Sequence, residues 1–93
     1  MKRRKLDINL VKMGRILRKH RKDHSPDSSM DDFIDYPVQL NLLNEGWISS
    51  KSLSNIENGY NLPSLSTLKK LSIAFEVDLI SLIDEIKDYI PVE

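Results

Sequence analysis

One stretch of the chain combines the side chains that can read the edges of nucleic-acid bases. It runs Ser49-Ser-Lys-Ser-Leu-Ser-Asn-Ile-Glu57. Hydroxyl and amide groups can donate and accept hydrogen bonds at base edges, and lysine favours the O6 and N7 acceptors of guanine. The spacing of Leu53 and Ile56 suits one buried helix face, which leaves the polar side chains on the opposite face. The pattern predicts either a helix that reads DNA or an ordinary surface helix rich in serine and asparagine.

Residue types that would support other chemistry are scarce. The chain has no cysteine, which excludes disulfides, thiol catalysis and zinc sites built on thiolates. It has only two histidines, so a metal site would depend on carboxylates, and we expect no metal and no other cofactor. The pairs Asp31/Asp32 and Asp84/Glu85 are neighbours in sequence, so their side chains point in different directions. We therefore expect no enzymatic activity.

Charge is distributed unevenly along the 93 residues, although the formal net charge is zero. Residues 1–24 hold ten of the 14 lysines and arginines, whereas residues 25–49 hold five acids and no base. A basic end suggests either a polyanionic partner or a solvated helix face, and residues 1–5 are predicted to be a basic arm that contacts phosphates or the minor groove. No apolar run approaches the length of a membrane span and no signal peptide is visible. We expect a cytoplasmic protein that does not bind membranes.

The spacing of apolar residues predicts an all-α fold, a compact bundle of about five helices in a single domain over residues 1–93. The first helix should end near Pro26, because a residue before proline is disfavoured in the helical conformation. Its apolar positions, at intervals of three and four, are Leu6, Leu10, Met13, Leu17 and His20. Residues 25–36 are acidic and rich in turn formers, so at most one helical turn is expected there, capped by Ser28 or Ser29.

The later helices are marked by residues that favour helix ends. The expected start and stop residues are Pro37 and Gly46 for the second helix, Ser49 and Gly59 for the third, Ser64 for the start of the fourth, and Asp78 for the start of a C-terminal helix over residues 78–90. A tight turn between the second and third helices would allow the third to enter the major groove of DNA.

Three motifs follow one another in the second half of the chain. They are Ile48-Ser-Ser-Lys-Ser-Leu-Ser-Asn-Ile-Glu-Asn-Gly59, Leu62-Pro-Ser-Leu-Ser-Thr-Leu-Lys-Lys-Leu71 and Ala74-Phe-Glu-Val77. Together they resemble the lambda-repressor-like family of helix-turn-helix DNA-binding domains (Cro/repressor, or xenobiotic-response-element type). The segment Gly14-Arg-Ile-Leu-Arg-Lys-His-Arg21 is similar to the first helix of that family. The resemblance covers about residues 10–86 and implies double-stranded DNA as the partner.

The resemblance also implies roles for individual residues. Gln39 corresponds to the glutamine that starts the second helix of the family and contacts phosphate or a base edge. Arg21 and Glu57 correspond to an ion pair between the first and third helices. The implied DNA-binding residues are Ser50, Lys51 and Asn55 as the main base readers, Ser49, Ser52 and Ser54 beside them, Asn58, Tyr60 and Asn61 in the loop that grips the backbone, and Gln39.

The chain departs from the family pattern in three places. The step from Arg21 to Gln39 is longer by about eleven residues, which predicts that residues 25–36 are an acidic insertion between helices 1 and 2. Trp47 stands where the turn usually has glycine. Leu43 replaces a small residue that lets helices 2 and 3 approach, so we expect a wider crossing or a shifted register there.

From these features we predict a sequence-specific DNA-binding transcriptional regulator, a repressor from a bacterium, phage or mobile element. The alternative is a protein-binding module, an antirepressor or anti-activator, whose acidic insertion docks a basic partner or mimics DNA. A homodimer is expected because one recognition helix contacts only a few base pairs. The apolar side chains expected to build it are Leu79, Leu82, Ile83, Ile86, Tyr89 and Ile90.

Overall fold

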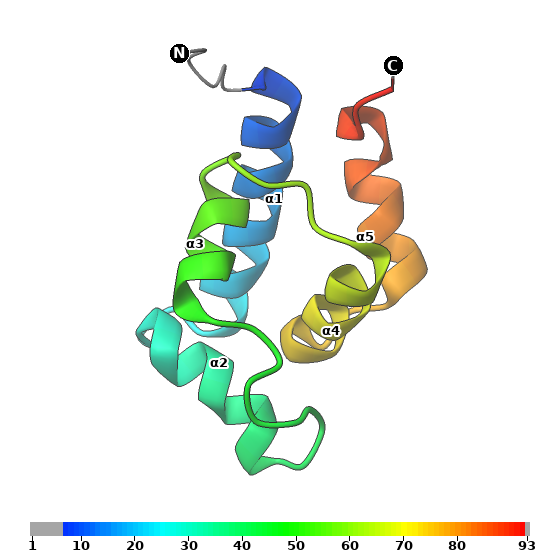
Figure 1. The fold of residues 1–93 in the computed structure, drawn as a ribbon. Coiled ribbons are helices and arrows are strands. Elements are labelled where there is room, and N and C mark those ends of the chain that lie inside the picture. The colour runs from blue at the N-terminus through cyan, green and yellow to red at the C-terminus, as the bar shows by residue number, and fades with distance from the viewer. Residues whose placement is uncertain (1–6, 93) are drawn as a thin grey trace.

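The computed structural model describes residues 7–92, which form five α-helices and a short 3-10 turn (Figure 1). The elements are α1 (Ile8–His24), α2 (Met30–Gln39), α3 (Ser50–Glu57), α4 (Leu65–Phe75), α5 (Leu79–Ile86) and η1 (Lys87–Tyr89). No strand occurs within residues 7–92, and the predicted all-α fold is confirmed. None of these helices is long and apolar enough to cross a bilayer. The predicted basic arm at residues 1–5 lies outside the described residues.

Each of the five α-helices begins after a serine or aspartate whose side chain caps it. The cap oxygen accepts a hydrogen bond from a backbone N–H of the first turn, a group that the helix itself leaves unpaired. The capping residues are Asp7, Ser29, Ser49, Ser64 and Asp78. The predictions for the third, fourth and fifth helices are confirmed, and of the two serines considered for the acidic segment it is Ser29 that caps.

The prediction that the second helix starts at Pro37 is wrong. α2 begins at Met30 and ends at Gln39, so residues 30–36 belong to this helix and not to an insertion. Phe33 and Pro37, one turn apart, are buried and attach α2 to the core. The carboxylates in its first turn favour the helix start because they oppose the positive end of the helix dipole. Pro37 has no backbone N–H to donate to the carbonyl oxygen of Phe33, so α2 lacks one of its own hydrogen bonds in its last turn.

The residues that the chain has in excess of a tight helix-turn-helix lie between α2 and α3, in a loop over residues 40–49. Trp47 is 9% exposed and attaches this loop to α2, since its Nε1–H donates to the carbonyl oxygen of Ile34 at 2.9 Å. Asn41 and Gly46 adopt positive φ angles of 59° and 79° where the loop changes direction. Leu43 belongs to this loop and not to the second helix as predicted, and it is partly buried against the core.

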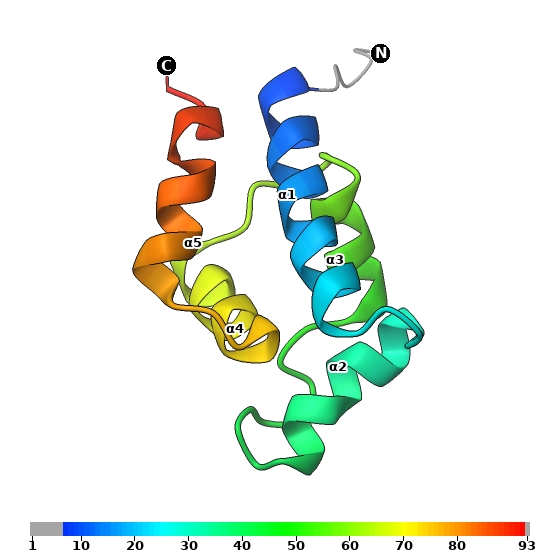
Figure 2. The same cartoon turned by 180° about the vertical axis from the view of Figure 1, so that it is seen from behind.

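α1 contacts α3 on one side and α4, α5 and η1 on the other (Figures 1 and 2). The core that these elements share consists of Met13, Leu17, Phe33, Trp47, Leu53, Ile56, Leu68, Leu71, Ala74, Phe75, Leu82 and Ile86. Gly14 allows the close approach of α1 and α3, because a Cβ atom there would lie 2.3 Å from the carbonyl oxygen of Glu57. Gly59, with φ of 82°, ends α3 as predicted.

The predicted C-terminal helix over residues 78–90 is divided in two. Its first part is α5, and its last residues tighten into η1. Leu82 and Ile86 are fully buried in the core of the single chain, which contradicts their assignment to a dimer surface. His20, one of the predicted apolar positions of α1, is half-buried, stacks on Phe75 at 5.4 Å between ring centroids, and lies 2.7 Å from a Glu85 oxygen.

Candidate nucleic-acid interface

α3 presents one polar face to solvent. Leu53 and Ile56 are buried as predicted, while Ser50 and Lys51 are exposed at the start of the helix. Ser54 and Asn55 are partly buried along its flank, and Ser52 is exposed beside them. The predicted buried side of this helix is confirmed, whereas Ser54 and Asn55, which were expected to face solvent fully, are partly buried. A short helix of this kind, with apolar anchors behind and small polar groups in front, has the shape and chemistry to enter a major groove.

Two of the predicted site residues are engaged in the helix cap. The Ser49 hydroxyl oxygen accepts from the backbone N–H of Ser52 at 3.0 Å. The same hydroxyl donates to the Ser52 hydroxyl at 2.9 Å. Both side chains are exposed, so they remain accessible, but their first role is to start α3.

A buried ion pair fixes α3 against α1. Arg21 donates from Nε to Oε2 of Glu57 at 2.6 Å and from Nη2 to Oε1 at 2.9 Å. The two residues are 5% and 3% exposed, and no buried side-chain nitrogen or oxygen among the described residues lacks a hydrogen-bond partner. Hydrogen bonding to Glu57 raises the pKa of Arg21 above its ordinary value in spite of burial. The ion pair implied by the family resemblance is therefore present, and it links α3 to α1.

Sequence reasoning missed Arg18, which joins this pair to the end of α3. Its Nε donates to Oε1 of Glu57 at 3.2 Å and its Nη2 to Oδ1 of Asn58 at 3.3 Å. The Asn58 amide in turn donates to the Ser54 hydroxyl at 3.3 Å. The sequence could have indicated this role, because Arg18 lies one turn before Arg21 on the same face of the first helix.

The loop after α3 carries the other predicted backbone contacts. Asn58 is the C-cap of α3, and the backbone N–H of Tyr60 donates to the carbonyl oxygen of Asn55 at 2.8 Å, which closes the helix end. The Tyr60 side chain is 53% exposed and Asn61 is exposed. These three polar side chains therefore continue the exposed polar face of α3 into the loop.

Gln39 does not belong to the polar face formed by α3 and the loop after it. The family resemblance implies that it starts the second helix, but it is the last residue of α2, and its amide donates to the Asp35 carboxylate. The first turn of α2, which lies beside the start of α3 in both views, instead carries Asp31 and Asp32 (Figures 1 and 2). Two carboxylates at that place repel a phosphate backbone.

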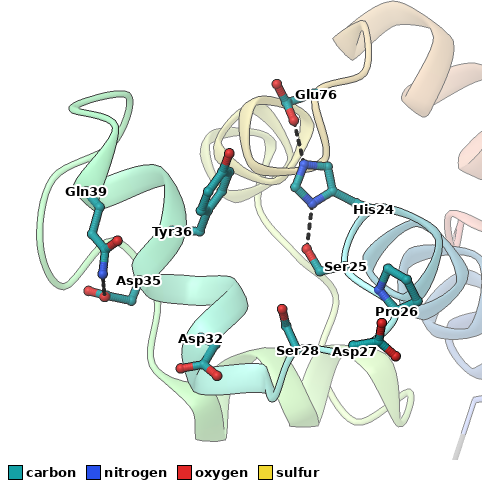
Figure 3. Close-up of a pocket in the computed structure, with 10 residues that line it drawn as sticks. All are labelled: His24, Ser25, Pro26, Asp27, Ser28, Asp32, Asp35, Tyr36, Gln39 and Glu76. Carbon is teal, nitrogen blue, oxygen red and sulfur yellow. Dashed lines mark hydrogen bonds and ion pairs between the residues drawn. The ribbon is translucent and has the colours of Figure 1, made fainter.

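An open hollow of about 720 Å³ lies between α2, the segment that follows α1 and the end of α4 (Figure 3). Its carboxylates are Asp27, Asp32, Asp35 and Glu76. His24 projects into it with Nε2 at 2.5 Å from a Glu76 oxygen and Nδ1 at 2.7 Å from the Ser25 hydroxyl. Residues 7–92 contain no cluster of His, Asp and Glu side chains arranged to hold a metal ion. The hollow is acidic, and its charge is opposite to that expected of a DNA-binding surface.

Comparison with known proteins agrees with the arrangement of the second half of the chain. Residues 44–82 match the family model described as Helix-turn-helix. The match begins in the loop before α3 and ends within α5, so it leaves out α1 and α2. No curated protein and no solved structure matches the chain.

Proposed function

We propose that the Cro/C1-type (XRE) helix-turn-helix domain at residues 44–82 makes this chain a sequence-specific transcriptional regulator that acts as a repressor. Domains of this family bind DNA and are typically not enzymes. The observation that carries the proposal is the exposed polar face of α3, held rigidly to α1 by the close approach at Gly14 and by the Arg21–Glu57 pair. A recognition helix must keep its orientation to read bases, and these contacts provide that orientation.

In this proposal α3 lies in the major groove and the flanking loop contacts the backbone. Ser50, Lys51 and Asn55 face base edges, where each good contact discriminates by about 1–3 kcal/mol. The side chains of the loop after α3 hydrogen-bond to phosphate oxygens, which fixes the register without reading sequence. The acidic hollow beside α2 is directed away from the duplex, and the first turn of α2, beside the start of α3, makes no phosphate contact because its carboxylates repel phosphates.

Binding to the DNA upstream of the protein's own gene tests the proposal. The wild-type chain should shift this duplex at nanomolar to micromolar concentration and prefer it over scrambled duplexes of the same length. Lys51→Ala should reduce that preference, and Lys69→Ala, which removes an exposed lysine of α4, should leave it unchanged. Equal weakening of all duplexes by Lys51→Ala would make Lys51 a phosphate contact. Absence of any binding to DNA would refute the proposed function.

A protein-binding role is the second candidate, and the acidic hollow beside α2 favours it. Asp27, Asp32 and Asp35 are exposed around it, and a basic segment of another protein would complement their charge. Changing these three residues to asparagine should abolish capture of such a partner and leave DNA binding intact. If the triple variant loses DNA binding and keeps the partner, this candidate is refuted.

We further propose that the regulator binds DNA as a homodimer. Leu82 and Ile86 are not available for this purpose, but Leu62, Leu65 and Ile90 are 50%, 66% and 39% exposed. They border an apolar groove of about 190 Å³ between the start of α4 and α5. A second copy covering this groove would bring two recognition helices together for two half-sites. Leu65→Glu should then halve the mass measured by sedimentation, and a monomeric wild-type chain would rule the dimer out.

A further inference from the structure

Arg18 approaches the buried ion pair from the solvent side and changes its charge balance. Arg21 already donates to both oxygens of the Glu57 carboxylate, at 2.6 and 2.9 Å. Arg18 adds a longer contact of 3.2 Å to one of the same oxygens. One carboxylate therefore faces two guanidinium groups. The three side chains together carry one positive charge that the cluster does not neutralise.

The charge that is not neutralised is accessible from solvent. The Arg18 side chain is 49% exposed, whereas that of Arg21 is 7% exposed. A guanidinium group has five N–H donors, and Arg18 uses two of them within the described residues, towards Glu57 and Asn58. The other donors of Arg18 can bind an anion, and arginine suits phosphate because its planar group can donate two parallel hydrogen bonds.

Arg18 lies at the end of α3, where the helix and the loop that follows it supply no cation of their own. Its partner Asn58 is the C-cap of α3, and residues 58–64, which connect α3 to α4, contain no charged side chain. Lys51 lies at the opposite end of α3. The recognition helix is therefore flanked by a cation at each end, one of its own at the start and one supplied by α1 at the finish.

We propose that Arg18 is a DNA-phosphate ligand at the C-terminal end of α3, an inference that rests on the proposed function. Its contacts with Glu57 and Asn58 hold the guanidinium group in place before DNA arrives, so less side-chain entropy is lost on binding. Because neutralising a phosphate releases a condensed counterion, such a ligand contributes to the salt dependence of binding, and a group that only positions its neighbours does not.

The test measures the affinity of the full chain for one preferred duplex by fluorescence anisotropy over a series of salt concentrations. The logarithm of the binding constant should fall linearly with the logarithm of the salt concentration, and Arg18→Gln should reduce the slope by about 0.9. Arg18→Lys keeps the charge and should keep the wild-type slope. Lys87→Gln removes a cation on η1, away from α3, and should also keep it.

Each outcome decides the inference. Weaker binding by Arg18→Gln at an unchanged slope would show that Arg18 only positions Asn58, and would overturn the proposal while the proposed function stands. If the wild-type chain binds no duplex, the proposed function and the inference about Arg18 both fail. Should Arg18→Gln not fold, the wild-type protein provides a second measurement, because the Nε–H nuclear magnetic resonance signal of Arg18 should shift on addition of DNA. A signal of Arg18 that does not shift would overturn the inference.

Discussion

The contact between α1 and α3 can be tested by adding a single methyl group at Gly14. A Cβ atom at this position would lie 2.3 Å from the carbonyl oxygen of Glu57 and 2.6 Å from that of Ile56. Carbon and oxygen atoms in close contact are normally about 3.3–3.6 Å apart, so Gly14→Ala requires the two helices to separate by about 1 Å. Both obstructing atoms belong to the backbone, and a change of rotamer cannot relieve the overlap.

The sign of the stability change distinguishes a crowded site from an open one. Alanine in a helix interior is favoured over glycine by about 1 kcal/mol, so an unobstructed Gly14→Ala would stabilise the protein. Overpacking of a core costs about 1–3 kcal/mol, and separation of the helices also lengthens the hydrogen bonds between Arg21 and Glu57. We expect a net loss of about 2 kcal/mol, which lowers the melting temperature of a domain of this size by about 8–16 °C.

Thermal unfolding followed by circular dichroism measures this change. Lys12→Ala, at an exposed position of the same helix, provides the control and should leave the melting temperature nearly unchanged. The variant with Gly14→Ala should also bind DNA more weakly at a temperature where it is fully folded, because α3 is displaced. An unchanged or raised melting temperature would refute the close approach of α1 and α3.

Three further substitutions test separate features of the fold by urea denaturation. Ser29→Ala should cost about 1 kcal/mol because it removes the cap of α2, whereas Ser28→Ala should cost little; the reverse order would place the helix start elsewhere. Trp47→Phe keeps a ring but removes the indole N–H that donates to the carbonyl oxygen of Ile34, so we expect a loss of about 1 kcal/mol, and a neutral effect would argue against that hydrogen bond. Arg21→Met leaves the buried Glu57 carboxylate with only the 3.2 Å contact to Arg18, so we expect a loss of stability of about 3–5 kcal/mol. A stabilised variant would contradict the buried pair.

The sequence predicts most of this fold because local signals and global packing agree. Capping serines and aspartates precede each helix, and the apolar spacing in α1, α3, α4 and α5 continues directly after them. The recognition helix is predictable for the same reason, since Leu53 and Ile56 leave only one face for its polar residues. The partners of these helices in space are harder to read, and Arg18 was missed because its contacts lie 39 and 40 residues away along the chain.

α2 is the element for which local signals mislead. Proline is common at the first position of a helix, so Pro37 suggests a start, although here it occupies the last turn. The acids around Phe33 obscure the apolar spacing of α2, which consists of Met30, Phe33, Ile34, Pro37 and Val38. Counted back along the sequence from α3, Gln39 corresponds to the glutamine that starts the second helix of the family. Because the loop between α2 and α3 takes up residues 40–49, Gln39 is instead the last residue of α2.

Trp47 also makes the loop between α2 and α3 visible to spectroscopy. It is the single tryptophan of the chain, it is 9% exposed, and its indole is attached to α2 through Ile34. Its fluorescence therefore reports on the docking of this loop and of α2, whereas circular dichroism in the far ultraviolet averages over all the helices. If the two signals change at different denaturant concentrations, unfolding is not two-state, and α2 detaches as a separate cooperative unit from the helices that carry the recognition face.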